Sequence, residues 1–468
     1  MKKVVETLIA GLGTDVVRTD ENTRQQRRHD YWVLSQLDDL QGRPAPSPCC
    51  VVRPRSTEEV VQVVKICQHQ GGAALVTHGL GSGVCGGIRT EPDVVLLDMG
   101  AMNRIVAIDE HNLIGTFEAG VRGSDAEAAL VSRGLTCGHY PQSIGISSVG
   151  GWVATRSAGQ FSTGYGNIED ILLSLEVVLP DGRVLQTRCT PRASAGPDLR
   201  QVFTGSEGTL GVITSVGLSL RRAPEMRKLG AFHTPSVDRG LQAQRVIMQS
   251  GWSPVVMRQY DEAEVTRLFP AHAREGHGLL LLVHEGPAAR VEAECASVAA
   301  LCETAELSAT DTAAAQQWLD DRNHVPTFKE YLDMGVILDT VEIAASWDRI
   351  GPIYERVIAE LGEVPGMVNA SGHTSHAYRS GVNIYLTFAA LLEDRSAMAS
   401  TYRECWRRIM DATVAGGGGV AHHHGIGRVR RDWLRAEVGE AGVHALAGLK
   451  SALDPAGIMN PGVLLPDR

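Results

Sequence analysis

Short apolar runs alternate with helix-spaced apolar positions through the first half of the chain. The run DVVLLDM (93–99) is short and rich in β-branched residues, which predicts a buried strand. Upstream, the segment STEEVVQVVKICQHQG (56–71) repeats apolar residues three and four positions apart, and Ser56 and Glu59 are spaced as a capping box, which predicts a helix. Because strands and helices keep alternating, we expect an α+β domain over 48–222.

The second half of the chain has longer elements. An alanine-rich helical pattern covers 288–307, and the runs GLLLLVHEG (278–286) and NIYLTFAAL (383–391) predict strands. A second α+β domain is the natural interpretation, followed by a helix and a proline-stopped tail. The expected division is an N-terminal helical segment 1–47, a first domain 48–222, a second domain 223–425 and a C-terminal segment 426–468.

Composition excludes several classes of protein. The chain has 468 residues and a formal net charge of −10, which argues against a nucleic-acid partner. Nine scattered cysteines form no CxxC pair, which favours a reducing compartment. The N-terminal apolar stretch is interrupted at Glu6, and no run has membrane-spanning length. We expect a cytoplasmic protein that meets membranes, if at all, at their periphery through its substrate.

Three glycine-rich loops carry the strongest chemical signal. They read HGLGSGVCGG (78–87), PQSIGISSVGGWVATRSAGQFSTGYGNIED (141–170) and GSEGTLGVIT (205–214). Backbone N–H groups freed from side-chain bulk form a concave nest that suits a diphosphate. The first loop alone could also be a tight strand-to-helix turn, and a Rossmann interpretation is weaker because no acidic residue follows at a convincing distance. The set of three favours a large anionic cofactor.

The wording of these loops resembles the FAD-binding domain of the vanillyl-alcohol-oxidase-type flavoenzymes. The matching segments are HGLGSGVCGG, GHYPQSIGISSVGGW (138–152), YGNIED (165–170) and GSEGTLGVIT. The resemblance implies an α+β fold, with a two-subdomain FAD-binding domain of the p-cresol methylhydroxylase (PCMH) type and an α+β cap domain built on an antiparallel sheet. The cofactor-binding residues that it implies are His78, Gly79, Leu80, Gly81, Ser82, Gly83, Val84, Pro141, Ser143, Ser147, Ser148, Gly150, Gly151, Thr155, Ala158, Gly159, Tyr165, Glu207, Gly208, Gly211 and Ile213.

The same resemblance indicates noncovalent FAD. Some relatives attach FAD through a histidine in the first loop, where this chain has Ser82, and others through a cysteine in the second loop, where it has Tyr140. Cys137 is near that position but out of register. His78 departs from the family pattern, which leaves its role open, and we expect it to be a structural histidine rather than a catalytic one.

The segment AHHHGIGRVRRDWL (421–434) carries the second signal. On an extended segment, His422 and His424 would share one face and His423 the other. Adjacent ligands on opposite faces serve a metal ion badly, so we predict no metal site.

Together with the strand that holds Tyr385, HHHGIG resembles the alkylglycerone-phosphate synthases. That resemblance implies that Tyr385 is the acid/base and that the three histidines, His422, His423 and His424, orient or deprotonate an alcohol. The reaction implied is exchange of the acyl group of an acyl-dihydroxyacetone-phosphate-like substrate for an alcohol through an adduct at flavin N5, with no net redox. Lys329 stands where that family has an arginine, and we predict substrate binding by Lys329 and Arg379.

Two alternatives stay open. Tyr385 on an alternating strand could simply be a core residue. The chain could also oxidise a 2-hydroxy acid or another alcohol by hydride transfer to flavin N5. Relatives that do so resemble HxGDGNxH followed by EHG around a metal, whereas this chain reads HAYRSGVNIY (376–385) and HHHG. We expect a small or lipid-like substrate, and the family resemblance suggests a homodimer.

Overall fold

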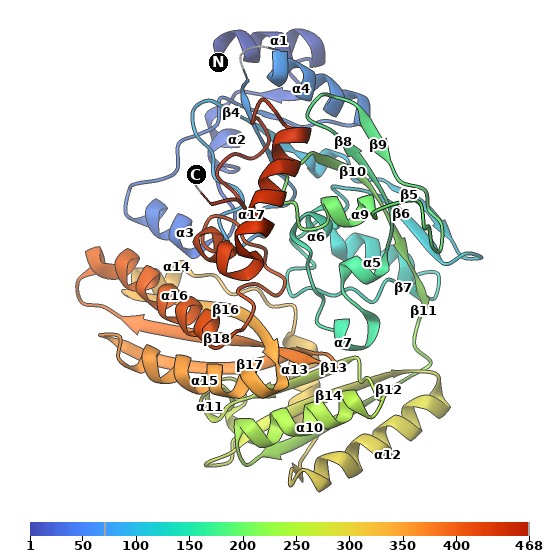
Figure 1. Cartoon of the computed structure of the whole chain (residues 1–468), viewed down its shortest axis with the longest axis vertical. Helices are drawn as coiled ribbons and strands as arrows, with labels where there is room; N and C mark the ends of the chain where they lie inside the picture. The colour runs from blue at the N-terminus through green and yellow to red at the C-terminus, as the bar shows by residue number, and fades with distance from the viewer. Residues whose placement is uncertain (70–71, 467–468) are drawn as a thin grey trace.

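The computed structural model describes residues 1–69 and 72–466 and divides the chain into two α+β halves (Figure 1). In Figure 1, the blue-to-green half lies above the yellow-to-orange half, and the red C-terminal helix runs beside the upper one. A β-rich core in the upper half and a large sheet in the lower half each form a separate hydrophobic cluster. The predicted α+β class is confirmed.

The first half contains two main sheets. The smaller has the order β1-β2-β4-β3, in which β2, β4 and β3 are parallel. The larger is antiparallel with the order β5-β6-β10-β8-β9. The strands are β1 (Val17–Arg18), β2 (Cys50–Val52), β3 (Ala74–His78), β4 (Val94–Asp98), β5 (Ile105–Asp109), β6 (Ile114–Glu118), β8 (Leu172–Val178), β9 (Val184–Gln186) and β10 (Val212–Ser219), with the small pair β7 (Leu135–Thr136) and β11 (Arg221–Arg222) at one edge.

Helices connect and cover these strands. They are α4 (Thr57–His69), α5 (Gly123–Val131), α6 (Val149–Thr155), α7 (Ser162–Tyr165), α8 (Ile168–Ile171) and α9 (Leu199–Phe203). Ser56 caps α4 by accepting a hydrogen bond from the N–H of Glu59 at 3.4 Å. The predicted capping box is only half formed, because the Glu59 carboxylate accepts from the N–H of Arg55 instead.

A seven-stranded antiparallel sheet forms the second half, with the order β15-β12-β14-β13-β17-β18-β16. Its strands are β12 (Met226–Thr234), β13 (Val256–Tyr260), β14 (Gly278–Gly286), β15 (Ser308–Ala309), β16 (Val336–Ser346), β17 (Met367–Ala377) and β18 (Gly381–Leu391). The accompanying helices are α10 (Val237–Gln249), α11 (Glu262–Leu268), α12 (Ala288–Thr304), α13 (Ala313–Asp321), α14 (Lys329–Asp333), α15 (Trp347–Gly362) and α16 (Met398–Ala415). Helices α10, α12, α15 and α16 pack on this sheet, so their apolar stripes form its core.

Both ends of the chain tie the halves together. Helix α1 (Lys2–Leu12) packs into the first core, whereas α3 (Val33–Leu40), after the short α2 (Glu21–Gln25), packs into the second. Helix α17 (Leu434–Leu453) is followed by a tail that returns to the first half, where Met459 bridges to Leu75 of β3. No helix among residues 1–69 and 72–466 combines the length and the apolar character needed to cross a membrane.

Candidate functional site

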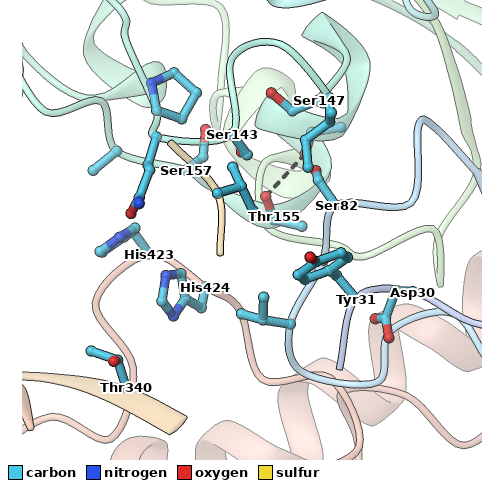
Figure 2. Close-up of a pocket in the computed structure, with 18 of the residues that line it drawn as sticks. Asp30, Tyr31, Ser82, Ser143, Ser147, Thr155, Ser157, Thr340, His423 and His424 are labelled. Atoms are coloured by element: carbon cyan, nitrogen blue, oxygen red, sulfur yellow. Dashed lines mark hydrogen bonds between the residues drawn. The ribbon is translucent and has the colours of Figure 1, made fainter. Parts of the chain in front are cut away.

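A cavity of about 920 Å³ lies between the two halves. Its wall combines the glycine loops of the first half with side chains of the large sheet and of the segment after α16. In Figure 2, His423, His424 and Thr340 lie on one side of this space, and Ser82, Ser143, Ser147 and Thr155 lie across from them. The volume is in the range of cavities that enclose a large cofactor together with a small substrate.

The first glycine loop presents unused donors to this cavity. The backbone N–H groups of residues 80–84 make no hydrogen bond within the part of the chain that the structure describes. Gly81 has φ 77°, a left-handed conformation that favours glycine. Gly79 packs so closely on the second loop that a Cβ there would lie 2.6 Å from the Ser148 hydroxyl. A nest of free N–H groups facing a large cavity fits a diphosphate.

All the predicted cofactor residues line the cavity except His78, Gly159 and Tyr165. His78 is buried, its Nδ1 contacts the Gly79 carbonyl, and burial lowers its pKa, so it is a neutral support of the loop. Gly159 allows a close backbone approach, because a Cβ there would lie 2.4 Å from the N of Tyr140. Tyr165 donates to Glu285 on the second half at 2.7 Å.

On the opposite wall, one rung of the large sheet aligns four polar side chains. The register pairs Tyr260 with His373, His373 with Tyr385, and Tyr385 with Glu342, across β13, β17, β18 and β16. Side chains of directly paired residues point to the same face. The His373 ring stacks on Tyr385 with centroids 4.8 Å apart and on Tyr260 at 5.1 Å. The sheet register therefore brings Tyr385 into the cavity wall.

Glu342, at the end of this rung, holds the histidine segment. Its buried carboxylate accepts the N–H groups of His422 at 2.7 Å, His423 at 3.3 Å and His424 at 2.7 Å. It also pairs with fully buried Arg430 at 2.8 Å. Burial alone would raise the pKa of Glu342, but Arg430 and the neighbouring imidazoles hold it at about 2. The carboxylate is therefore ionised and acts as a fixed anchor.

The predicted alternation of the three histidines is wrong. The segment is not a strand, because three successive N–H groups converge on one carboxylate. The rings consequently gather: the Nδ1 atoms of His422 and His423 lie 2.7 Å apart, and the His423 and His424 ring centroids lie 4.5 Å apart. His423 and His424 line the cavity, whereas His422 lies behind them.

A second buried carboxylate fixes the other end of this segment. Glu207, in the third glycine loop, accepts the N–H groups of Ile426 and Gly427, each at 2.8 Å. Its φ is 51°, a strained value for a non-glycine residue. Burial raises the pKa of Glu207 to about 7. One short segment is thus held by the large sheet at one end and by the glycine loops at the other.

Tyr385 and His423 form a hydrogen-bonded pair at the cavity wall. The Tyr385 hydroxyl and His423 Nε2 are 2.7 Å apart. Burial raises the pKa of the Tyr385 phenol, and burial together with the neighbouring imidazoles lowers the pKa of His423 well below its usual value. The pair therefore joins a protonated phenol to a neutral imidazole.

Sequence reasoning overlooked His376, which completes the histidine cluster. His376 is buried, its Nε2 contacts the Gly159 carbonyl at 2.9 Å, and its Nδ1 has no hydrogen-bond partner among the described residues. One nitrogen each of His376, His422 and His423 lie within 4.8 Å of one another. His376 is the first residue of the HAYRSGVNIY segment, so the signal that could have found it is its match to the first histidine of the HxGDGNxH pattern.

Arg258 is the second residue that the sequence analysis missed. It is 9% exposed and donates from Nε to the Tyr260 hydroxyl at 2.9 Å and from Nη1 to Ser375 at 2.7 Å. It makes no salt bridge within the described residues, and its Nη2 donates to none of them. A buried cation without an acidic partner at a cavity wall is suited to bind an anionic ligand. The available signal was a lone arginine in a short apolar strand.

Neither predicted substrate residue lies on the cavity wall. Lys329 begins α14, and its exposed ammonium pairs with Asp333 one turn later at 2.5 Å. Arg379 is exposed in the turn between β17 and β18. Its carbonyl accepts hydrogen bonds from Gln249 and Trp347. The arginines that line the cavity are Arg258, Arg267 and Arg322, and Arg267 pairs with Glu264 at 2.9 Å.

Comparison with known proteins agrees with this geometry. Residues 48–188 match the FAD binding domain model, and residues 223–464 match the model of the FAD linked oxidases, C-terminal domain. The uncharacterized FAD-linked oxidoreductase YgcU of Escherichia coli K12 is 33% identical over 99% of this chain and 98% of its own length. The alkyldihydroxyacetonephosphate synthase of Trypanosoma brucei brucei is 28% identical over 99% of this chain and 80% of its own length.

Solved structures share the whole architecture. An alkyldihydroxyacetonephosphate synthase structure superposes with a TM-score of 0.82 at 24% identity, covering 98% of this chain and 84% of the other. A substrate-bound p-cresol methylhydroxylase superposes with a TM-score of 0.76 at 18% identity, covering 98% and 96%. The glycine-loop nest, the two family models and the shared fold all agree. The chain therefore belongs to the FAD-linked oxidases of the vanillyl-alcohol oxidase and p-cresol methylhydroxylase fold, and FAD is its cofactor.

Proposed function

We propose that this FAD-dependent enzyme exchanges the acyl group of an acyl-dihydroxyacetone-phosphate-like substrate for an alcohol. The observation that carries the proposal is the Tyr385–His423 pair on the same cavity wall as Arg258. An acid/base pair beside a cation without a counter-ion suits a substrate that carries an anionic group near its reacting carbon. The similarity to alkyldihydroxyacetonephosphate synthases over nearly the whole chain supports the same reaction class.

The chain's own groups would move protons and hold the substrate. Bound FAD supplies a ring that can accept a hydride or bond a substrate carbon. Tyr385 stays protonated at neutral pH because burial raises its pKa, so it can give a proton to a leaving oxygen. His423 stays neutral because burial lowers its pKa. It can therefore accept the phenol proton and later return a proton to the phenol.

Arg258 is the anion-binding group in this proposal. Its Nε and Nη1 are held by Tyr260 and Ser375, so the guanidinium plane is fixed before the substrate arrives. A planar fork can bind two oxygens of a phosphate or carboxylate at once. Arg258→Lys would keep the charge and lose the fork, and we expect a raised KM of about tenfold or more, while Arg258→Met would lose the charge as well.

A second candidate reaction is oxidation of a 2-hydroxy acid. The unpartnered Nδ1 of His376 favours it, because a neutral imidazole nitrogen close to His423 could accept the proton of a substrate hydroxyl. Arg258 would then bind the carboxylate. Both reactions use Arg258 as the cation, and they are separated by their redox balance, because oxidation leaves the flavin reduced and acyl exchange does not.

The deciding experiment mixes the purified holoenzyme with each substrate class without oxygen. Acyl-dihydroxyacetone phosphate with a long-chain alcohol should give ether product with no lasting loss of flavin absorbance. Stoichiometric bleaching by a 2-hydroxy acid, with no ether product, would instead establish the oxidase. Tyr385→Phe should lose at least about a hundredfold in turnover yet stay yellow. Tyr354→Phe is the control, since its hydroxyl contacts Asp261 away from the cavity.

We also propose that FAD is bound noncovalently. Ser82, at the first attachment position, offers no nucleophile of the kind used by relatives, and the hydroxyl of Tyr140 points away to Glu127 and Thr136. Acid precipitation should therefore release all the flavin into the supernatant. Yellow colour retained in the washed pellet would contradict this.

A further inference from the structure

Four side chains form a continuous row of hydrogen bonds that starts at the cavity. Tyr385 contacts His423 Nε2 at 2.7 Å, and His423 Nδ1 contacts His422 Nδ1 at 2.7 Å. His422 Nε2 then contacts the Tyr378 hydroxyl at 2.7 Å. Each imidazole uses both of its nitrogens in the row, which leaves neither ring free for another partner.

The far end of the row reaches the protein surface. Tyr378 is partly exposed, and the next two residues of the β17–β18 turn, Arg379 and Ser380, are exposed. Asn167 donates to the Tyr378 oxygen at 3.1 Å, so this oxygen can accept from both Asn167 and His422 while its own O–H points elsewhere. The row therefore joins the phenol on the cavity wall to a second, partly exposed phenol beside the β17–β18 turn.

We propose that the row Tyr385–His423–His422–Tyr378 is a proton path that connects the cavity with solvent. The inference rests on the proposed function only in that Tyr385 exchanges a proton with the substrate. In one direction, Tyr385 takes a proton from the substrate as it gives its own to His423 Nε2, His423 passes its Nδ1 proton to His422 Nδ1, and His422 passes its Nε2 proton to Tyr378, whose own proton goes to water. One proton enters and one leaves, and both imidazoles change tautomer without becoming charged.

The electrostatic surroundings suit such a path. Burial lowers the pKa of His422 to about 4 and that of His423 well below its usual value, so neither ring traps the proton as an imidazolium near neutral pH. The titratable and charged groups around the two rings are Glu342, Arg430, His376 and His424, and Arg258 acts on Tyr385. Glu169 and Asp170 face Tyr378, and burial raises its pKa to about 12.

The central contact requires a proton. Two nitrogens bound to one tetrahedral zinc ion at about 2.0 Å would lie about 3.3 Å apart. The His422 and His423 Nδ1 atoms lie 2.7 Å apart, which is the separation of a short N–H···N hydrogen bond. Two lone pairs facing each other at this distance would repel, so one of the two Nδ1 atoms carries a hydrogen.

Kinetics of the holoenzyme test the path. Tyr378→Phe removes the outer link and leaves the Tyr385–His423 pair in place. We expect turnover to fall about tenfold at neutral pH and to recover when imidazole is added as a small proton carrier. Tyr354→Phe, which also removes one partly buried hydroxyl, should stay within about twofold of wild type and gain nothing from imidazole. Turnover of Tyr378→Phe equal to that control would overturn the path.

A second measurement needs no turnover. In histidine-¹⁵N-labelled wild-type protein, His422 and His423 should each carry one proton, on opposite nitrogens: Nε2 of His422 with Nδ1 of His423, or the reverse. Protons on both Nε2 atoms, or stoichiometric zinc uptake at the pair, would leave the central contact without hydrogen and overturn the path.

The experiments distinguish a failure of the proton path from a failure of the proposed function. An inactive Tyr385→Phe together with a fully active Tyr378→Phe would end the path and leave the proposed function standing. A fully active Tyr385→Phe would end the proposed function, and the tautomer measurement would still decide the path.

Discussion

At the scale of single residues, Glu342 fixes both the backbone and the charge of the site. Its carboxylate accepts three successive histidine N–H groups and pairs with Arg430, and both side chains are fully buried. Replacement by an amide keeps an acceptor but leaves the guanidinium charge without compensation. Uncompensated buried charges are expensive, which explains why this one carboxylate determines where the histidines lie.

We therefore expect Glu342→Gln to lower the free energy of unfolding by about 3–5 kcal/mol and to abolish turnover. The sign of the pH dependence follows from its lowered pKa. The stabilisation is complete above the ordinary carboxyl pKa of about 4.3 and is lost as pH falls towards 2. Urea unfolding measures the loss. Glu360→Gln, which removes an exposed i,i+4 pair with Arg356, should cost less than about 1 kcal/mol, and an equal loss in both variants would refute the anchor.

The pH dependence expected from Asp30 has the opposite direction, because its charge should weaken FAD binding as the pH rises. It lines the cavity beside the first glycine loop, where a Cβ on Gly83 would lie 3.2 Å from its Oδ2, and burial raises its pKa to about 7. Above pH 7 its negative charge would repel the FAD diphosphate, so FAD should bind about tenfold more tightly at pH 6 than at pH 8. Flavin fluorescence titration at both pH values measures this.

The control for that titration is Asp30→Asn. The variant should bind FAD with a smaller pH difference, and the remaining difference should come from Glu207, whose pKa is also about 7. If Asp30→Asn retains the full wild-type difference, Asp30 is not the group that titrates.

At the scale of elements, periodicity predicted the strands but not the loop geometry. The alternation in NIYLTFAAL predicted a strand and left Tyr385 open as a core residue or an acid/base, and the structure has it on the cavity wall. The same reasoning failed for the three histidines, because a long-range contact with Glu342 curls their backbone. Arg258 reaches the site only through the pairing of β13 with β17, which no local pattern encodes.

The segment 322–328, between α13 and α14, covers the cavity and is held mainly through its carbonyls. Gln160 donates to the Arg322 carbonyl at 2.6 Å, Gln142 to that of His324 at 2.6 Å, and Tyr31 to that of Pro326 at 2.8 Å. The double variant Gln142→Ala/Gln160→Ala should release the segment and speed tryptic cleavage after Arg322 several-fold, because proteases cut locally opened chain. Gln41→Ala, which removes a similar bond to the Arg395 carbonyl, is the control and should not change that cleavage.

At the scale of the whole molecule, the two halves are coupled through residues 422–427. Glu342 of the large sheet holds one end of this segment and Glu207 of the glycine loops holds the other. We expect FAD to bind the glycine loops, and a ligand that binds only the folded state stabilises every element whose unfolding requires its release. The structure therefore predicts that FAD protects the second half from hydrogen exchange.

Glu207→Ala tests that coupling. In wild-type protein, adding FAD should slow amide exchange in the glycine loops, in 421–430 and in β16 and β18. In Glu207→Ala the Ile426 and Gly427 N–H groups lose their acceptor, so protection by saturating FAD should remain in the loops and fade in β16 and β18. Exchange measured by mass spectrometry, with both proteins saturated with FAD, separates this effect from weaker binding. Unchanged protection of β16 and β18 would mean that the halves communicate through another contact, such as the tail that joins Met459 to Leu75.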